Sequence, residues 1–108
     1  MLKDFIDKPI AILTNKHCGS TGEIMVNLLE AHPRVTRIGE ETGGCIHFSN
    51  MGFFFLPHSK LRINMPCQYR AYRDKRFIER TGIAPHIYVP AGKDAFDVAL
   101  TYLSLIHI

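Results

Sequence analysis

The stretch that most constrains the fold is an apolar run followed directly by a polar turn and an amphipathic run. Residues 9–14 (PIAILT) are apolar and partly β-branched, which predicts a buried strand of a parallel sheet. The turn HCGSTGE occupies residues 17–23, and residues 20–31 have the apolar spacing of a helix. Ser20 therefore lies where a sheet ends and a helix begins, with a hydroxyl beside the N–H groups of the helix N-terminus.

Ser20 admits two interpretations. Ser20-x-x-Glu23 is typical of a capping box, in which each of the two side chains accepts a hydrogen bond from the other residue's N–H. Such boxes open many ordinary helices, so this stretch alone favours the capping interpretation. In the other interpretation Ser20 is a nucleophile, and the N–H of Thr21 stabilises the negative charge that develops on the attacked group.

The rest of the chain predicts a single small α/β domain. With the first strand and helix, a second short strand completes a βαβ unit, and a hairpin, a last strand and a closing helix follow. The expected elements are a strand over residues 35–38, a hairpin over 53–65 that Pro66 ends, a strand after Gly82 and a helix over 94–103.

Apolar spacing also predicts which sides of the two helices face the core. In the first helix the expected apolar residues are Ile24, Leu28, Met25 and Leu29. In the closing helix they are Phe96, Ala99, Leu100 and Leu103.

Composition and charge argue against several classes of protein. The chain has 108 residues, 46% of them hydrophobic and 21% charged, which is typical of one globular domain. The net charge is only +3, and acidic residues interrupt the basic and aromatic segment 69–80, so no nucleic acid partner is expected. No apolar run approaches the ~20 residues of a membrane span. Cys18, Cys45 and Cys67 lack the spacing of a metal site, so no metal or cofactor is expected.

Five separated motifs, taken in order, resemble those of the S41 peptidases, the tail-specific or C-terminal processing proteases. The matching segments are the apolar strand 10–13, Ser20-Thr21-Gly22-Glu23, Ile38-Gly39-Glu40-Glu41-Thr42-Gly43-Gly44, the hairpin 53–65 and Gly82-Ile83-Ala84-Pro85-His86. The resemblance covers residues 8–103. It implies a serine-type peptidase that acts on peptides or proteins. It also implies a partial ClpP/crotonase-like α/β fold made of a βαβ unit, a hairpin and a closing helix.

The resemblance also implies roles for particular residues. Ser20 falls on the nucleophile, the N–H of Thr21 on one oxyanion-hole donor, and Glu79 on the glutamate that precedes the Gly-Ile-x-Pro motif. Cys45 stands where the processing proteases have a lysine base, and a neutral thiol is a poor base. The chain therefore looks closer to the lysine-less branch, which includes tricorn-type and retinoid-binding-protein-type members and takes its base from an upstream histidine.

None of the six histidines of this chain matches that upstream base. His17, three positions before Ser20, is a weak candidate, because a tight turn would have to bring it back. His86 stands where the family usually has aspartate. The general base is therefore expected from an N-terminal half of the same protein, and the 108 residues alone are expected to be inactive.

The sequence leaves some further expectations. Residues 1–103 are expected to be the C-terminal part of the catalytic domain. Residues 104–108 are expected to be a non-native tail, because the last six residues resemble the translation of a common sequencing adapter. The compartment is unknown, although the family implies an extracytoplasmic place. An alternative function is a non-catalytic relative that binds an apolar ligand or a peptide on the same scaffold, which the departure at Cys45 and the phenylalanine run 53–55 leave open.

Overall fold

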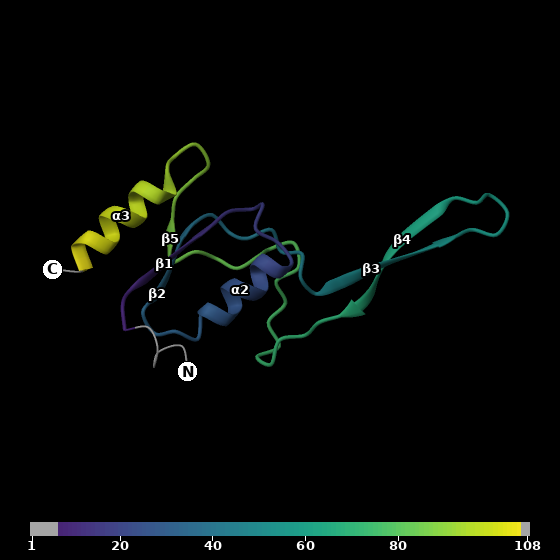
Figure 1. The fold of residues 1–108 in the computed structure, drawn as a ribbon, viewed down its shortest axis with the longest axis horizontal. Helices are drawn as coiled ribbons and strands as arrows, with labels where there is room; N and C mark the ends of the chain where they lie inside the picture. Colours follow the sequence, from purple (N-terminus) through teal and green to yellow (C-terminus); the bar gives the residue numbers. More distant parts are fainter. Residues whose placement is uncertain (1–6, 107–108) are drawn as a thin grey trace.

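The computed structural model describes residues 7–106, and the expectations for residues 1–6, 107 and 108 lie outside the described part. The elements, in chain order, are β1 (Ile10–Thr14), α2 (Thr21–Leu29), β2 (Val35–Gly39), β3 (Phe48–Phe55), β4 (Arg62–Tyr69), β5 (Ile87–Tyr88) and α3 (Ala95–Ile106). They form a mixed α/β domain with a projecting hairpin, 67 × 35 × 21 Å in extent (Figure 1). The predicted α/β class is therefore confirmed.

The central sheet is parallel and has the strand order β1-β2-β5. Ile10 to Thr14 pair in register with Val35 to Gly39, so the predicted βαβ unit is confirmed. The last strand is only two residues long and joins the far side of β2, where Ile38 pairs with Ile87. Because all three strands run in the same direction, their carboxyl ends meet at one edge of the sheet, and the turn that carries Ser20 starts from this edge.

The two helices cover opposite faces of this sheet, because alternate residues of β1 point to opposite sides. Ile12 packs with the core cluster that contains Val26 of α2. Ala11 packs with the cluster that contains Ile38 and Ala99 of α3. Figure 1 shows the same arrangement, with the strands between the two helices.

The core-facing side of each helix was predicted only in part, since Ile24 of α2 packs against the core and Ala99 of α3 is buried, as predicted. In α2 the buried residues are Glu23 and Val26, whereas Met25 is 53% and Leu28 is 56% exposed. In α3 the packed residues are Ala95, Val98, Ala99 and Tyr102. Each helix has a second apolar stripe, so periodicity alone does not identify the side that the neighbouring loops cover.

The hairpin is longer than predicted. Its arms pair from Phe48 with Tyr69 to Phe55 with Arg62, and Pro66 lies inside β4 opposite Met51 instead of ending the strand. A proline lacks the N–H of a ladder bond, and a hairpin of two strands has only edge strands, where this loss is tolerated. The hairpin projects away from the central sheet (Figure 1).

The closing helix α3 also runs further than predicted, to Ile106 rather than Leu103. The hydroxyl of Ser104 donates to the carbonyl of Leu100 at 2.8 Å within this extension. Within residues 7–106, no helix has both the length and the apolar character that crossing a membrane requires.

Candidate active site

Ser20 occupies an unusual backbone conformation between β1 and α2. Its φ is 52° and its ψ is −116°, while an ordinary N-cap residue is in the β region. This is the conformation that the first central position of a type II′ turn reserves for glycine. For a residue with a side chain it costs of order 1–3 kcal/mol, and such strain is found at functional sites. Ser20 is also exposed to solvent.

The N–H of Thr21 is free at the start of α2. Its neighbours are occupied, because Gly22 N–H donates to the Gly19 carbonyl at 3.0 Å and Ile24 N–H donates to the Ser20 carbonyl at 3.1 Å. No atom among residues 7–106 accepts a hydrogen bond from Thr21 N–H. A free N–H beside a hydroxyl, at the positive end of a helix dipole, suits the stabilisation of an oxyanion.

Glu23 is the most heavily bonded side chain of the site. It is 0% exposed, and its carboxylate accepts four hydrogen bonds. Its Oε2 accepts from the N–H of Ser20 at 3.1 Å and of Cys45 at 3.0 Å. Its Oε1 accepts from the hydroxyl of Thr42 at 2.6 Å and from the N–H of Gly44 at 2.7 Å. The bond to Ser20 was expected from the capping box, whereas the three to residues 42–45 were not.

Thr42 extends this network to a third motif. Its hydroxyl accepts from the N–H of Ile83 at 2.7 Å, and its own N–H donates to the Ile83 carbonyl at 3.1 Å. Gly82 has a φ of +74°, and a Cβ at this position would lie 2.0 Å from the Thr42 carbonyl oxygen. Three motifs far apart in the sequence therefore converge on the segment that holds Ser20.

Glu79 is half-buried and lies on the next part of the same framework. Its Oε2 accepts from the N–H of His47 at 3.0 Å. The His47 ring is 1% exposed, and its Nε2 accepts from the N–H of Ile78 at 2.9 Å. Within residues 7–106 no hydrogen bond or ion pair joins Glu79 directly to Ser20. The two residues are connected through the segment 44–47, which Glu23 and Glu79 hold from either end.

Two thiols flank the turn that carries Ser20. The Sγ of Cys45 lies 2.4 Å from the place that a Cβ would take on Gly19, and the Sγ of Cys18 lies 3.0 Å from the corresponding place on Gly22. Burial raises the pKa of the Cys18 thiol, and the charges of Glu23 and Cys45 raise it further. Cys18 is therefore protonated at neutral pH, and neither thiol supplies a cationic base of the lysine type.

The two histidines singled out by sequence have other contacts. His17 is exposed, and among residues 7–106 its one hydrogen bond joins its backbone N–H to the side chain of Asn15 at 2.9 Å. His86 pairs with β2, since its Nδ1 accepts from the N–H of Arg37 at 2.9 Å and its N–H donates to the Arg37 carbonyl at 2.8 Å. The imidazole thus accepts a backbone hydrogen bond, as the aspartate of the family pattern could.

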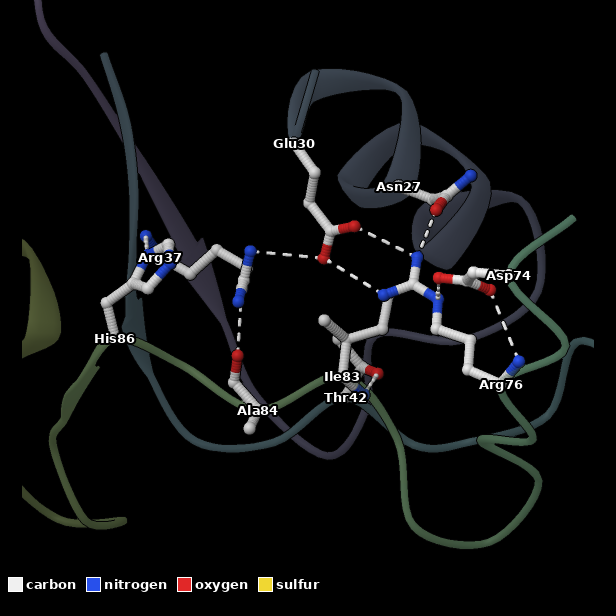
Figure 2. Close-up of polar contacts among 9 residues, drawn as sticks. All are labelled: Asn27, Glu30, Arg37, Thr42, Asp74, Arg76, Ile83, Ala84 and His86. Atoms are coloured by element: carbon white, nitrogen blue, oxygen red, sulfur yellow. Dashed lines mark hydrogen bonds and ion pairs between the residues drawn. The ribbon is translucent and has the colours of Figure 1, made fainter. Parts of the chain in front are cut away.

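A charged cluster behind the site joins α2, β2 and the segment 74–84 (Figure 2). Glu30 lies between two arginines, 3.1 Å from Arg37 and 2.9 Å from Arg76. Arg37 also donates to the Ala84 carbonyl at 2.8 Å, and Arg76 donates to Asn27. Burial alone would lower the pKa of Arg76, but its hydrogen bond to Glu30 and the charge of that carboxylate raise it. The cluster fixes the strands and loops that carry the site.

An open cleft of about 640 Å³ lies at the carboxyl edge of the parallel sheet. Its walls come from the turn after β1, including His17 and Cys18, from Gly39 and Glu40 after β2, and from the loop 89–96. Within residues 7–106, no group of three or more histidine, cysteine or acidic side chains is placed to hold a metal ion. The cleft adjoins the turn of Ser20, which makes it a candidate place for a substrate.

Comparisons with known proteins identify the family. The profile of Peptidase family S41 matches residues 3–89. A crystal structure of a candidate peptidase from Parabacteroides merdae is 25% identical, with a TM-score of 0.70 over 88% of this chain and 31% of that one. The tricorn protease is 21% identical, with a TM-score of 0.70 over 93% of this chain and 11% of that one. No curated protein matches the chain.

A third solved structure, mature CPAF complexed with lactacystin, is 22% identical, with a TM-score of 0.64 over 92% of this chain and 19% of that one. The chain thus spans about a third or less of the length of these proteins. Because the profile match includes Ser20, the 39–44 segment and the Gly82-Ile83 motif, and the fold agrees over most of the chain, this chain belongs to peptidase family S41.

Proposed function

We propose that this chain carries the nucleophile-bearing part of a serine-type peptidase site, with Ser20 as the nucleophile. The observation that carries the proposal is the strained conformation of Ser20, at φ 52° and ψ −116°, in an exposed strand-to-helix turn. A serine that only caps a helix has no need of this conformation, because ordinary N-caps lie in the β region. A nucleophile needs it, since the sharp turn presents the hydroxyl and clears space for the substrate.

In the proposed reaction the Ser20 Oγ attacks the carbonyl carbon of a peptide bond. The free N–H of Thr21 donates to the oxyanion that forms, and the helix dipole of α2 favours this negative charge. Glu79 supports the site through the segment 44–47. The general base and a second oxyanion donor come from a part of the protein outside these 108 residues, as in the lysine-less branch of the family, because Cys45 occupies the lysine position.

The proposed substrate is a peptide or a protein. The cleft at the carboxyl edge of the sheet is lined by His17 and Cys18, which precede Ser20 in the same turn, so it offers an extended chain a place beside that turn. Its walls offer charges of both signs, from Lys16, Lys93, Glu40 and Asp94. The site therefore suits the mixed polar and apolar surface of a peptide better than a small apolar ligand.

Labelling by a fluorophosphonate probe tests the proposal. In the full-length protein, expressed from the complete gene, the probe is expected to label Ser20, and Ser20→Ala is expected to abolish labelling. The 108-residue chain alone is expected to label no faster than its Ser20→Ala variant, because a nucleophile without its base retains little rate. Mass spectrometry of the labelled peptide identifies the modified residue.

A matched control is Ser49→Ala, on the hairpin, which is expected to label as fast as the wild type. Equal labelling of wild type and Ser20→Ala would contradict the assignment. Complete absence of labelling in a folded full-length protein would favour a non-catalytic relative that binds peptides on this scaffold.

The strain at Ser20 gives a prediction that needs no activity. Ser20→Gly is expected to stabilise the chain by about 1 kcal/mol, because glycine adopts this conformation without steric cost and the gain exceeds its extra unfolded-state entropy. Ser20→Ala keeps the strain and is expected to give no gain. Urea unfolding followed by circular dichroism measures both. A loss of stability in Ser20→Gly equal to that in Ser20→Ala would point to a plain cap.

A further inference from the structure

The two thiols beside the Ser20 turn have no part in the proposed reaction. Cys45 is exposed, Cys18 is half-buried, and both are free thiols. They lie beside the turn that leads into α2, Cys45 against Gly19 and Cys18 against Gly22, and the N–H of Gly22 donates to the Gly19 carbonyl at 3.0 Å. The third cysteine, Cys67, is on the hairpin, packed over Gly52. Cys18 and Cys45 therefore both lie beside the Ser20 turn, whereas Cys67 lies on the hairpin.

The backbone holds the segments of these two thiols close together. Gly43 N–H donates to the Cys18 carbonyl at 2.7 Å. One oxygen of Glu23 accepts from the N–H groups of Ser20 and Cys45, so these two nitrogens lie within about 6 Å of each other. The charge of Cys45 also contributes to the raised pKa of Cys18, after burial and Glu23, as expected for thiols within electrostatic reach. Cys18 and Cys45 therefore lie on neighbouring segments that direct backbone hydrogen bonds and the Glu23 carboxylate hold side by side.

We propose that Cys18 and Cys45 form a reversible disulfide when the protein meets a peroxide. Neither the fold nor the proposed peptidase chemistry requires this pairing, and it can form whether or not Ser20 is catalytic. It would link the turn before the nucleophile to the segment 39–45. Oxidation would then reach the framework of Ser20 without touching its hydroxyl.

The chemistry balances with hydrogen peroxide as the oxidant. The thiolate of exposed Cys45 attacks one peroxide oxygen, the O–O bond breaks, and a sulfenic acid forms with release of hydroxide. The Cys18 sulfur then attacks the sulfenic sulfur, loses its proton and expels a second hydroxide, which leaves as water. Two thiols lose two electrons, and one peroxide becomes two waters.

The test uses the 108-residue chain with the substitution Cys67→Ser, which removes the third thiol. Treatment with hydrogen peroxide at low protein concentration is expected to remove two hydrogen atoms in mass, without forming dimers. Proteolysis is expected to give a peptide pair joined through Cys18 and Cys45. A reductant should restore both thiols. The urea midpoint of the oxidised chain is expected to rise, because the cross-link restrains the unfolded chain.

Two variants keep the test decisive. Cys45→Ser and Cys18→Ser, each in the Cys67→Ser background, are expected to lose the joined peptide, and circular dichroism shows whether each remains folded. The proposal is overturned if Cys45 is oxidised to sulfinic acid with Cys18 still free, or if the disulfide forms only between molecules. Neither outcome bears on fluorophosphonate labelling of Ser20, so the two proposals fail separately.

Discussion

Replacing Glu23 by alanine is expected to remove a large part of the free energy of unfolding of the 108-residue chain. The change leaves the buried N–H of Gly44 and the hydroxyl of Thr42 without their acceptor, and it frees the N–H groups of Ser20 and Cys45. Each unsatisfied buried donor costs about 1–3 kcal/mol, so a loss of about 4 kcal/mol is expected. A small domain has only about 5–15 kcal/mol in total. Urea unfolding at 25 °C measures the loss.

The matched control is Glu41→Ala, an exposed glutamate on the same segment, which is expected to change the stability by less than about 0.5 kcal/mol. The stability of Glu23→Gln is expected to fall between those of the two alanine variants. The glutamine amide keeps one acceptor oxygen, but its NH₂ group faces N–H or O–H donors that bonded to the other carboxylate oxygen. If Glu23→Ala were as stable as Glu41→Ala, the carboxylate would not hold the three motifs together.

Replacing Gly82 by alanine is expected to cost at least about 3 kcal/mol. The new Cβ would lie 2.0 Å from the Thr42 carbonyl oxygen and 2.6 Å from its carbon, and both are backbone atoms that cannot move aside alone. The positive φ adds a further cost of about 1 kcal/mol. The thermal midpoint of a domain of this size is expected to fall by more than about 12 °C.

Gly92→Ala separates the clash from the backbone cost. Gly92 has a φ of +92°, but no atom lies within 4 Å of the place that its Cβ would take. Only the cost of the positive φ is expected there, about 1 kcal/mol. Calorimetry of the two variants side by side measures the difference. Equal midpoints would show that Gly82 is needed only for its dihedral angle and not for the close approach to Thr42.

Much of the fold can be predicted from the sequence, because its elements are local patterns. The apolar run before the turn, the proline after the helix and the short strand at 35–39 predict the βαβ unit. The core-facing sides of the helices were predicted only in part, because Phe96 with Leu100 and Val98 with Tyr102 have the same spacing, and only the position of the sheet decides between them. The prediction that Pro66 ends the hairpin was also wrong. A strand tolerates a proline where it lies at the edge of a sheet, and the sequence does not show which strands are edge strands.

The candidate site shows the same division between local and distant contacts. The place of Ser20 between strand and helix follows from neighbouring residues, whereas its strained φ becomes evident only in the structure. The sequence showed Glu23 as a partner of Ser20 three positions away. Its bonds to Thr42 and Gly44 cross about twenty residues, and no periodicity indicates them. The role of His47 could not be predicted from the sequence, because nothing in the residues around it indicates that its imidazole is buried.

The strand order has a consequence for the order in which the chain folds. The arms of the hairpin are neighbours in sequence, and such hairpins form within about 1–10 μs. In contrast, the pairing of Ile38 in β2 with Ile87 in β5 is expected to form slowly, because it joins parallel strands that are far apart in the sequence. Ile83, which donates its N–H to the Thr42 hydroxyl, lies only four residues before β5 and so reaches its place together with this strand. We therefore expect the geometry around Ser20 to be among the last features that the folding chain acquires.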